Sequence, residues 1–327
     1  MEINMHRGAE KIIRTCIALQ AGEQLLIVTE ASRLSIARAL EQEALAVGAE
    51  PTLCIMQARQ RDGQEPPQAI AAAMEVSDAF LLVVGKSITH TDAVKNAVAA
   101  GSRGLVLTHF TEQMLVSGGI EGDFPALKPV CVAMAEAMAG AEHIVLTSPS
   151  GTHLEYSAHG RRGNHLYCMV EPGQFSTIPT VEANVSPLEG TAEGVIVADA
   201  SIPYLGIGLL KEPVTLQVRQ GRITDISGGE QAELLRRDLA DKQDPNVYNI
   251  AEHGVGLNPK CHFCGFMLED EGVYGSCHIG IGTSITLGGT VKARCHYDLI
   301  MRNGTIVADG RTLMDHGKVL LETRPHA

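Results

Sequence analysis

The chain has 327 residues, 45% hydrophobic and 20% charged, with a net charge of −12 when histidine is neutral. This composition is typical of a soluble globular protein long enough for two domains. The acidic balance and the lack of a Lys/Arg cluster exclude a nucleic-acid partner, and no apolar run reaches the ~18 residues of a membrane span. The N-terminal sequence lacks a secretory signal pattern, so we expect a cytoplasmic protein.

The first part of the chain alternates short apolar runs with helical patterns. The apolar runs predict strands at residues 24–29, 52–56, 79–84 and 104–107, and the periodic segments predict helices at residues 32–47, 67–76 and 92–100. Such alternation indicates crossover connections and a parallel sheet. We therefore predict a doubly wound α/β domain over residues 1–128, ending in the Gly- and Pro-rich segment 118–129.

The remainder, residues 129–327, is predicted to be a mixed, mostly antiparallel β domain. A helix is expected at residues 130–138 and another at 229–242, where apolar residues recur at helical spacing. Strand patterns with frequent Gly and Pro fall at residues 143–147, 153–157, 194–198 and 214–219. Residues 220–222 (Gln-Gly-Arg) separate two alternating runs and predict a hairpin turn.

Familiar nucleotide and serine-hydrolase motifs are missing from both parts. The segment after residues 24–29 reads Glu-Ala-Ser-Arg in place of a Gly-x-Gly-x-x-Gly fingerprint, and the chain holds neither a Walker A motif nor a Gly-x-Ser-x-Gly elbow. The parallel domain therefore offers no predicted nucleotide site.

The strongest candidate for chemistry is the pair His296 and Asp298 in the apolar run 293–301. Residues two apart in a strand point to the same side, so the imidazole and the carboxylate can face one cavity while Tyr297 faces away. One imidazole and one carboxylate form half of a typical Zn²⁺, Mn²⁺ or Fe²⁺ site. The alternative is a solvated strand face.

Three further residues support a metal-binding interpretation. His278 lies in the glycine-rich segment 275–282, Glu252 precedes the turn 254–259, and Glu182 stands in a proline-bracketed apolar stretch. A buried carboxylate needs a partner, because burying it unpaired is costly. Three carboxylates and two imidazoles would suit one divalent ion or two that share a bridging water.

Two other interpretations remain open. Cys261 and Cys264, with Cys277 thirteen residues after the second of them, resemble the spacing of a structural zinc site. His90 follows the third predicted strand and precedes a helix, at the edge where open α/β sheets place ligands, so it is a candidate general base. A solvated histidine beside a helix cap is the alternative there.

The order of these candidate ligands resembles the aminopeptidase T family of metallo-aminopeptidases. The resemblance rests on the stretches 178–187, 251–259, 270–282 and 295–301. It implies that Glu182, Glu252, His278, His296 and Asp298 hold two divalent ions (Zn, Co or Mn) and that a metal-bound water attacks a peptide carbonyl. This chain has Ile285 where that family carries a tyrosine, and it is shorter than typical members.

A second resemblance is to the family of 2,5-dihydroxypyridine 5,6-dioxygenases. It rests on stretches 87–105, 189–199, 256–259 and 288–299. It implies a mononuclear Fe²⁺ site in which His296 and Asp298 match two ligands and His90 matches the proposed base. Glu252 stands where that family has another histidine ligand, and Gly280 stands at its serine ligand. The set Glu252, His278, His296 and Asp298 could still hold one iron.

Three functions therefore remain. The first is a metal-dependent hydrolase of the aminopeptidase type, with a metal-activated water attacking an amide or peptide bond and Glu182 and His90 as candidate catalytic residues. The second is a non-heme Fe(II) ring-opening dioxygenase acting on a small cyclic substrate. The third is an inactive, metal-free scaffold of the same fold. A peptide or small-molecule substrate is expected in either active case, and the resemblances add a homodimer as the candidate assembly.

Overall fold

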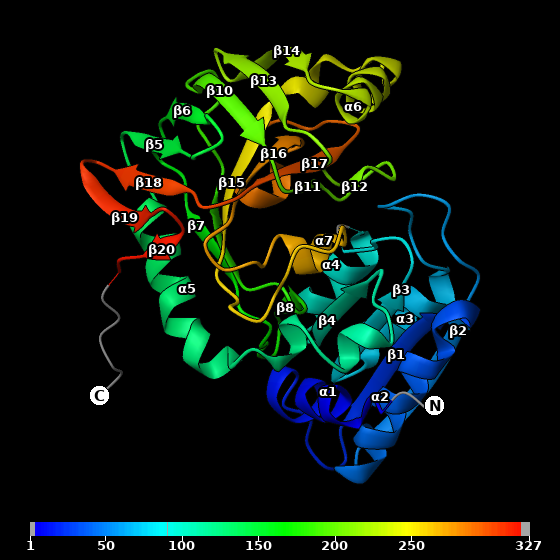
Figure 1. The fold of residues 1–327 in the computed structure, drawn as a ribbon. Helices are drawn as coiled ribbons and strands as arrows, with labels where there is room; N and C mark the ends of the chain where they lie inside the picture. Colours follow the sequence, from blue (N-terminus) through cyan, green and yellow to red (C-terminus); the bar gives the residue numbers. More distant parts are fainter. Residues whose placement is uncertain (1–3, 90, 322–327) are drawn as a thin grey trace. The chain divides into compact units, whose positions relative to one another are not determined.

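The computed structural model describes residues 4–89 and 91–321 and divides into two compact units. The first unit comprises the chain up to Phe124 together with Tyr167–Pro179, and the second comprises Pro125–Leu166 together with the chain from Thr180 onward. The units are shown in Figure 1. The division differs from the single boundary expected after residue 128, because the chain returns to the first unit for thirteen residues (167 to 179) before it completes the second.

The first unit is built on a five-stranded parallel sheet in the order β2-β1-β3-β4-β8. Its strands are β1 (Gln24–Glu30), β2 (Glu50–Met56), β3 (Ala79–Val84), β4 (Arg103–Thr108) and β8 (Phe175–Thr177). The first four are drawn blue to cyan in Figure 1, with β8 in green. The short strand β8 comes from the returning segment and is the strand of this sheet that the sequence pattern missed.

One helix precedes the first strand of this sheet, and three more connect its first four strands along the chain. They are α1 (His6–Lys11), continued by a π-helix at Ile12–Cys16, α2 (Leu34–Ala46), α3 (Gln68–Val76) and α4 (Asp92–Ala99). The strand β3 is buried along its whole length, as a strand covered on both faces must be. On one face, Phe80, Val106 and Met74 belong to a core cluster that α3 and α4 share with the sheet. Gly104 makes room for this packing, since a Cβ there would lie 2.0 Å from the Phe80 ring.

The second unit contains two antiparallel sheets. An eight-stranded sheet has the order β14-β13-β10-β6-β5-β18-β19-β20, with β5 (Ile144–Thr147), β6 (His153–Tyr156), β10 (Glu193–Ala198), β13 (Val214–Arg219), β14 (Arg222–Ser227), β18 (Thr305–Ala308), β19 (Arg311–Asp315) and β20 (Lys318–Val319). A seven-stranded sheet has the order β12-β11-β17-β16-β15-β9-β7, with β7 (Gly163–Leu166), β9 (Glu182–Val185), β11 (Ser201–Ile202), β12 (Gly208–Leu209), β15 (Ile250–Gly256), β16 (Cys277–Gly282) and β17 (His296–Met301).

Three α-helices accompany these sheets: α5 (Phe124–Met138), α6 (Glu230–Asp241) and the single turn α7 (Met267–Asp270). The helix α5 begins six residues before the predicted start at residue 130. Pro125 falls in its first turn, where a missing N–H costs nothing, and Pro129 lies inside it. The Gly- and Pro-rich stretch that marked a boundary is therefore partly helical.

The predicted fold class is confirmed: a parallel α/β part is followed by a mainly antiparallel β part. The predicted hairpin turn is also present. Gln220 and Gly221 both have positive φ, 48° and 71°, and they connect β13 to β14 in a two-residue loop. Two positive φ angles in succession match the right-handed twist of a hairpin, which is why Gly is favoured there.

Candidate metal centre

Four adjacent strands of the seven-stranded sheet, β17, β16, β15 and β9, carry the predicted site residues. His296 and Asp298 lie on β17, His278 on β16, Glu252 on β15, and Glu182 begins β9. Cross-strand pairing places a glycine opposite each of them. Gly282 pairs with His296, Gly280 with both Asp298 and Glu252, Gly254 with His278, and Gly256 with Glu182. Residues directly opposite one another share a face of the sheet, so all five side chains project from the same face.

The glycines provide the space that the imidazoles occupy. A Cβ on Gly254 would lie 2.0 Å from His278 Nε2, and a Cβ on Gly280 would lie 2.8 Å from both Glu252 Cβ and His296 Cε1. Real Cβ atoms essentially never show contacts this short. The glycine-rich sequence around the cluster is therefore a packing requirement of the two histidine rings.

The five side chains meet in one cluster. His296 Nε2 lies 2.9 Å from Glu252 Oε2 and 3.3 Å from Asp298 Oδ1. His278 Nε2 lies 3.7 Å from Glu182 Oε2 and 3.9 Å from Glu252 Oε1. These atoms form two triads of potential ligands, one with His278 and one with His296, and Glu252 belongs to both. Only the His296 side chain is appreciably exposed, at 25%.

The two outer carboxylates are each held by one oxygen and leave the other without a partner. Asn184 Nδ2 donates to Glu182 Oε1 at 2.9 Å, and the Tyr204 hydroxyl donates to Asp298 Oδ2 at 2.6 Å. Glu182 Oε2 and Asp298 Oδ1, on the cluster side, accept no hydrogen bond from the described residues. An unpartnered buried carboxylate oxygen is costly, so this donor set fits a divalent cation.

A hydrogen bond to the backbone orients the ring of His296. Its Nδ1 lies 2.8 Å from the carbonyl oxygen of Thr283, and this hydrogen bond requires the proton to be on Nδ1. The Nε2 lone pair of the neutral imidazole then faces the cluster, as it does in metal-ligating histidines whose second nitrogen is held by a carbonyl.

The pKa values of the cluster residues are shifted by burial and by their charged neighbours. Burial, reinforced by the charge of Glu252, raises the pKa of Glu182 to about 7. Burial by itself would lower the pKa of both imidazoles, but the neighbouring carboxylates raise that of His278 to about 9 and also raise that of His296. The same imidazoles outweigh burial at Asp298 and lower its pKa. In the absence of a metal, protonated histidines balance the negative charge of the carboxylates, and a bound metal ion would balance that charge instead.

The structure adds residues that the sequence did not single out. Glu271, which follows α7, is 8% exposed, and its Oε1 lies 3.4 Å from the Tyr204 hydroxyl. Burial, followed by the nearby charge of Asp298, raises its pKa. Asn184 could have been found, because it stands two residues after Glu182 on the same strand. Tyr204 is far from every predicted ligand in sequence, and no pattern marked it.

Two other predictions have different outcomes. His90 lies outside the described residues, so its role as a base stays a prediction. Among the residues that the structure describes, no group of potential ligands includes a cysteine, so the alternative of a zinc site at Cys261 and Cys264 finds no support. Cys277, its third candidate ligand, instead packs beside Gly304, where a Cβ would lie 2.4 Å from its sulfur.

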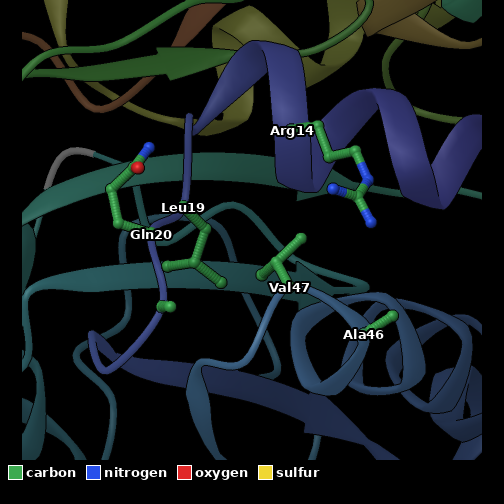
Figure 2. A pocket seen from close by; sticks show the side chains of 6 residues that line it. Arg14, Leu19, Gln20, Ala46 and Val47 are labelled. Carbon is green, nitrogen blue, oxygen red and sulfur yellow. The ribbon is translucent and has the colours of Figure 1, made fainter.

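A separate depression lies in the first unit and contains none of these residues. Figure 2 shows its lining, and its volume is about 460 Å³. The lining consists of Arg14, Leu19, Gln20, Ala21, Ala46 and Val47. One guanidinium and one amide among aliphatic side chains provide neither a general base nor a metal ligand.

The chain thus has an α/β unit and a β-rich unit, and the carboxylates and imidazoles clustered in the β-rich unit are potential ligands of a divalent metal. The chain belongs to the NicX family of enzymes, described as 2,5-dihydroxypyridine 5,6-dioxygenase, whose family model matches residues 5–321. A relative with that name from Pseudomonas putida KT2440 is 32% identical over 162 residues, and the alignment spans about half of both proteins, 46% of each chain.

Two solved structures share the fold of this chain. The structure of 2,5-dihydroxypyridine dioxygenase from P. putida KT2440 matches with a TM-score of 0.84, covering 97% of both chains at 20% identity. AmpT, an aminopeptidase T, from Thermus thermophilus matches with a TM-score of 0.71, covering 97% of this chain and 99% of that one at 18% identity. At these identities the likeness concerns the fold alone. Both resemblances predicted from the sequence are thereby confirmed. Within the described ranges, no helix has the length and apolar character needed to cross a membrane.

Proposed function

We propose that this protein is a metal-dependent ring-opening dioxygenase that acts on a small hydroxylated nitrogen heterocycle. The observation that carries the proposal is the family match, which runs through residues 5–321 and therefore includes all five residues of the cluster. The relative of the same name supports it over the part that aligns. The comparisons thus favour the dioxygenase alternative over the hydrolase that the sequence placed first.

Glu252, His296 and Asp298 would hold the metal on the side of the cluster that solvent reaches, since His296 is its most exposed member. A redox-active divalent ion such as Fe²⁺ would allow dioxygen to react with the ring. Both oxygen atoms then enter the organic product as one ring carbon–carbon bond breaks, so no external reductant is consumed.

The protein side chains supply orientation and charge. The Thr283 carbonyl keeps His296 in the tautomer whose Nε2 can act as a ligand, and the buried carboxylates supply negative charge that a cation must balance. Glu182, with its pKa near 7, can accept or release a proton beside the reacting centre. We retain His90 as the proposed general base for the substrate hydroxyl.

A second candidate function is the aminopeptidase-like hydrolase. One specific observation favours it: the two triads share Glu252, whose Oε1 is directed toward His278 and whose Oε2 is directed toward His296. A carboxylate that presents one oxygen to each of two adjacent sites is suited to bridge two ions, and two-metal centres are common in hydrolases. The number of ions bound per chain therefore separates the two candidates.

The decisive experiment is elemental analysis of protein purified without chelator, combined with two assays. About one iron per chain, with oxygen uptake on hydroxypyridines, supports the dioxygenase. About two zinc, cobalt or manganese ions with release of N-terminal amino acids from peptides supports the hydrolase instead. Protein that holds no metal after reconstitution with each of these ions refutes both and leaves the inactive scaffold.

A further inference from the structure

Tyr204 places a phenol hydroxyl between two buried carboxylates. It donates to Asp298 Oδ2 at 2.6 Å, while Glu271 Oε1 lies 3.4 Å from the same hydroxyl oxygen. A hydroxyl has one proton, so the shorter contact is the hydrogen bond and Glu271 remains at the edge of its reach. The hydroxyl oxygen also lies 3.1 Å from the sulfur of Met267.

The ring of Tyr204 is itself held in place from the opposite side. It packs against Tyr297, with ring centroids 4.9 Å apart and an interplanar angle of 40°. Tyr297 in turn donates to Asp238 Oδ2 on α6 at 3.0 Å, and the Lys242 ammonium lies 5.3 Å from the centre of its ring. Tyr297 points away from the metal ligands of its own strand, as the sequence predicted, yet it supports the residue that contacts Asp298.

The hydrogen bond decides which oxygen of Asp298 is available. With Oδ2 engaged by Tyr204, the other oxygen, Oδ1, has no hydrogen-bond partner among the described residues and lies 3.3 Å from His296 Nε2. Oδ1 is therefore the oxygen of Asp298 that a metal in the cluster can bind without competing with a hydrogen bond. Without the hydroxyl, Oδ2 would be buried, unpaired and close to a second carboxylate.

We infer that Tyr204 is a positioning residue of the metal centre: its hydroxyl holds Asp298 Oδ2 and leaves Oδ1 as the oxygen that faces the other potential ligands. The inference rests on the metal site proposed above. It concerns neither the substrate nor the reaction, so it can be tested by metal binding alone. Outer hydrogen bonds of this kind change metal affinity by about 10- to 100-fold.

The test is a titration of the metal-free, full-length protein with Co²⁺, with affinity measured by competition against a chromophoric chelator and coordination followed by visible absorption. Tyr204→Phe keeps the ring that packs against Tyr297 and removes only the hydroxyl. We expect its Co²⁺ affinity to fall about 10- to 100-fold, with a changed absorption spectrum and a far-UV circular dichroism spectrum like that of the wild-type protein. Tyr274→Phe is the matched control, because the Tyr274 hydroxyl accepts a hydrogen bond from the Val319 backbone N–H at 3.3 Å, outside the cluster.

A second variant tests whether a hydrogen-bond donor at Asp298 carries the effect. In Tyr204→Phe with Glu271→Gln, the new amide can donate to Asp298, so we expect part of the affinity to return. A double variant as weak as Tyr204→Phe overturns the role given to the hydrogen bond. Wild-type affinity and spectrum in Tyr204→Phe, or an equal loss in the Tyr274→Phe control, overturns the role of Tyr204. If the wild-type protein itself binds no Co²⁺, the metal site fails before this inference is reached.

Discussion

Gly254 should be as sensitive to substitution as a metal ligand, although it has no side chain. In Gly254→Ala the new methyl would lie 2.0 Å from His278 Nε2, whereas ordinary contact begins at 3.4 Å, so the ring would have to move by about 1.4 Å. His278 is 1% exposed and has little space in which to move. Overpacking of this kind costs about 1–3 kcal/mol, and in a unit of this size each kcal/mol lowers the melting temperature by about 2–4 °C.

Differential scanning fluorimetry and elemental analysis check this expectation together. We expect Gly254→Ala to melt earlier and to bind less metal, because a displaced His278 ring disturbs Glu252, the carboxylate that both groups of potential ligands share. The matched control combines Gly254→Ala with His278→Ala, in which the methyl enters space that the imidazole has left. There the additional cost of Gly254→Ala should be small. A full melting-temperature loss in that background, or a single variant with wild-type stability and metal content, refutes the steric argument.

Three further predictions concern other parts of the molecule. His296→Ala should abolish metal binding to its triad while circular dichroism shows the fold intact; retained metal would remove His296 from the site. The double substitution of Cys261 and Cys264 to serine should leave the metal content unchanged. A loss of zinc in that variant would support the structural zinc site that the cysteine spacing suggested. Burial raises the pKa of Glu23, but hydrogen bonds from Arg103 and a backbone N–H outweigh it and hold the pKa below its ordinary value of 4.5. The Glu23–Arg103 pair therefore stabilises the fold above pH 4.5 and loses this contribution as the pH falls. The melting temperature of Glu23→Gln should consequently fall less on acidification than that of the wild-type protein. An equal fall in both proteins contradicts this prediction.

The parallel sheet could be predicted because its strands are buried on both faces and therefore appear as uninterrupted apolar runs. Every residue of β3 and β4 is buried, and both were found within two residues of their true ends. The short strands could not be predicted in this way. The strand β8 has three residues, and it joins the first unit only through contacts that bring distant parts of the chain together. A periodic pattern cannot develop over so few positions.

The same distinction applies to the site. Residues two apart on a strand share a face, so the pairing of His296 with Asp298 followed from sequence spacing alone. The convergence of His278 and Glu252 depends on strand register, for which the glycines opposite them were only an indirect signal. Tyr204 lies on a loop after β11, and its contact with Asp298 joins residues 94 positions apart. Contacts of this type depend on tertiary packing, so no local sequence pattern predicts them.

The packing around Gly280 leaves no room for a side chain at that position. The dioxygenase resemblance places a serine ligand at Gly280, but any Cβ at that position would lie 2.8 Å from Glu252 Cβ and from His296 Cε1. A serine there would displace both neighbours, so the carboxylate of Glu252 and the serine are alternatives that cannot coexist in this packing. Glu252 instead contributes a negative charge, and with Glu182 and Asp298 the cluster presents three carboxylates to two imidazoles. Gly280→Ser should therefore weaken metal binding in this protein, although the resemblance implies a serine at this position. Stronger iron binding by that variant would show that the Glu252 side chain can move to make room for the serine.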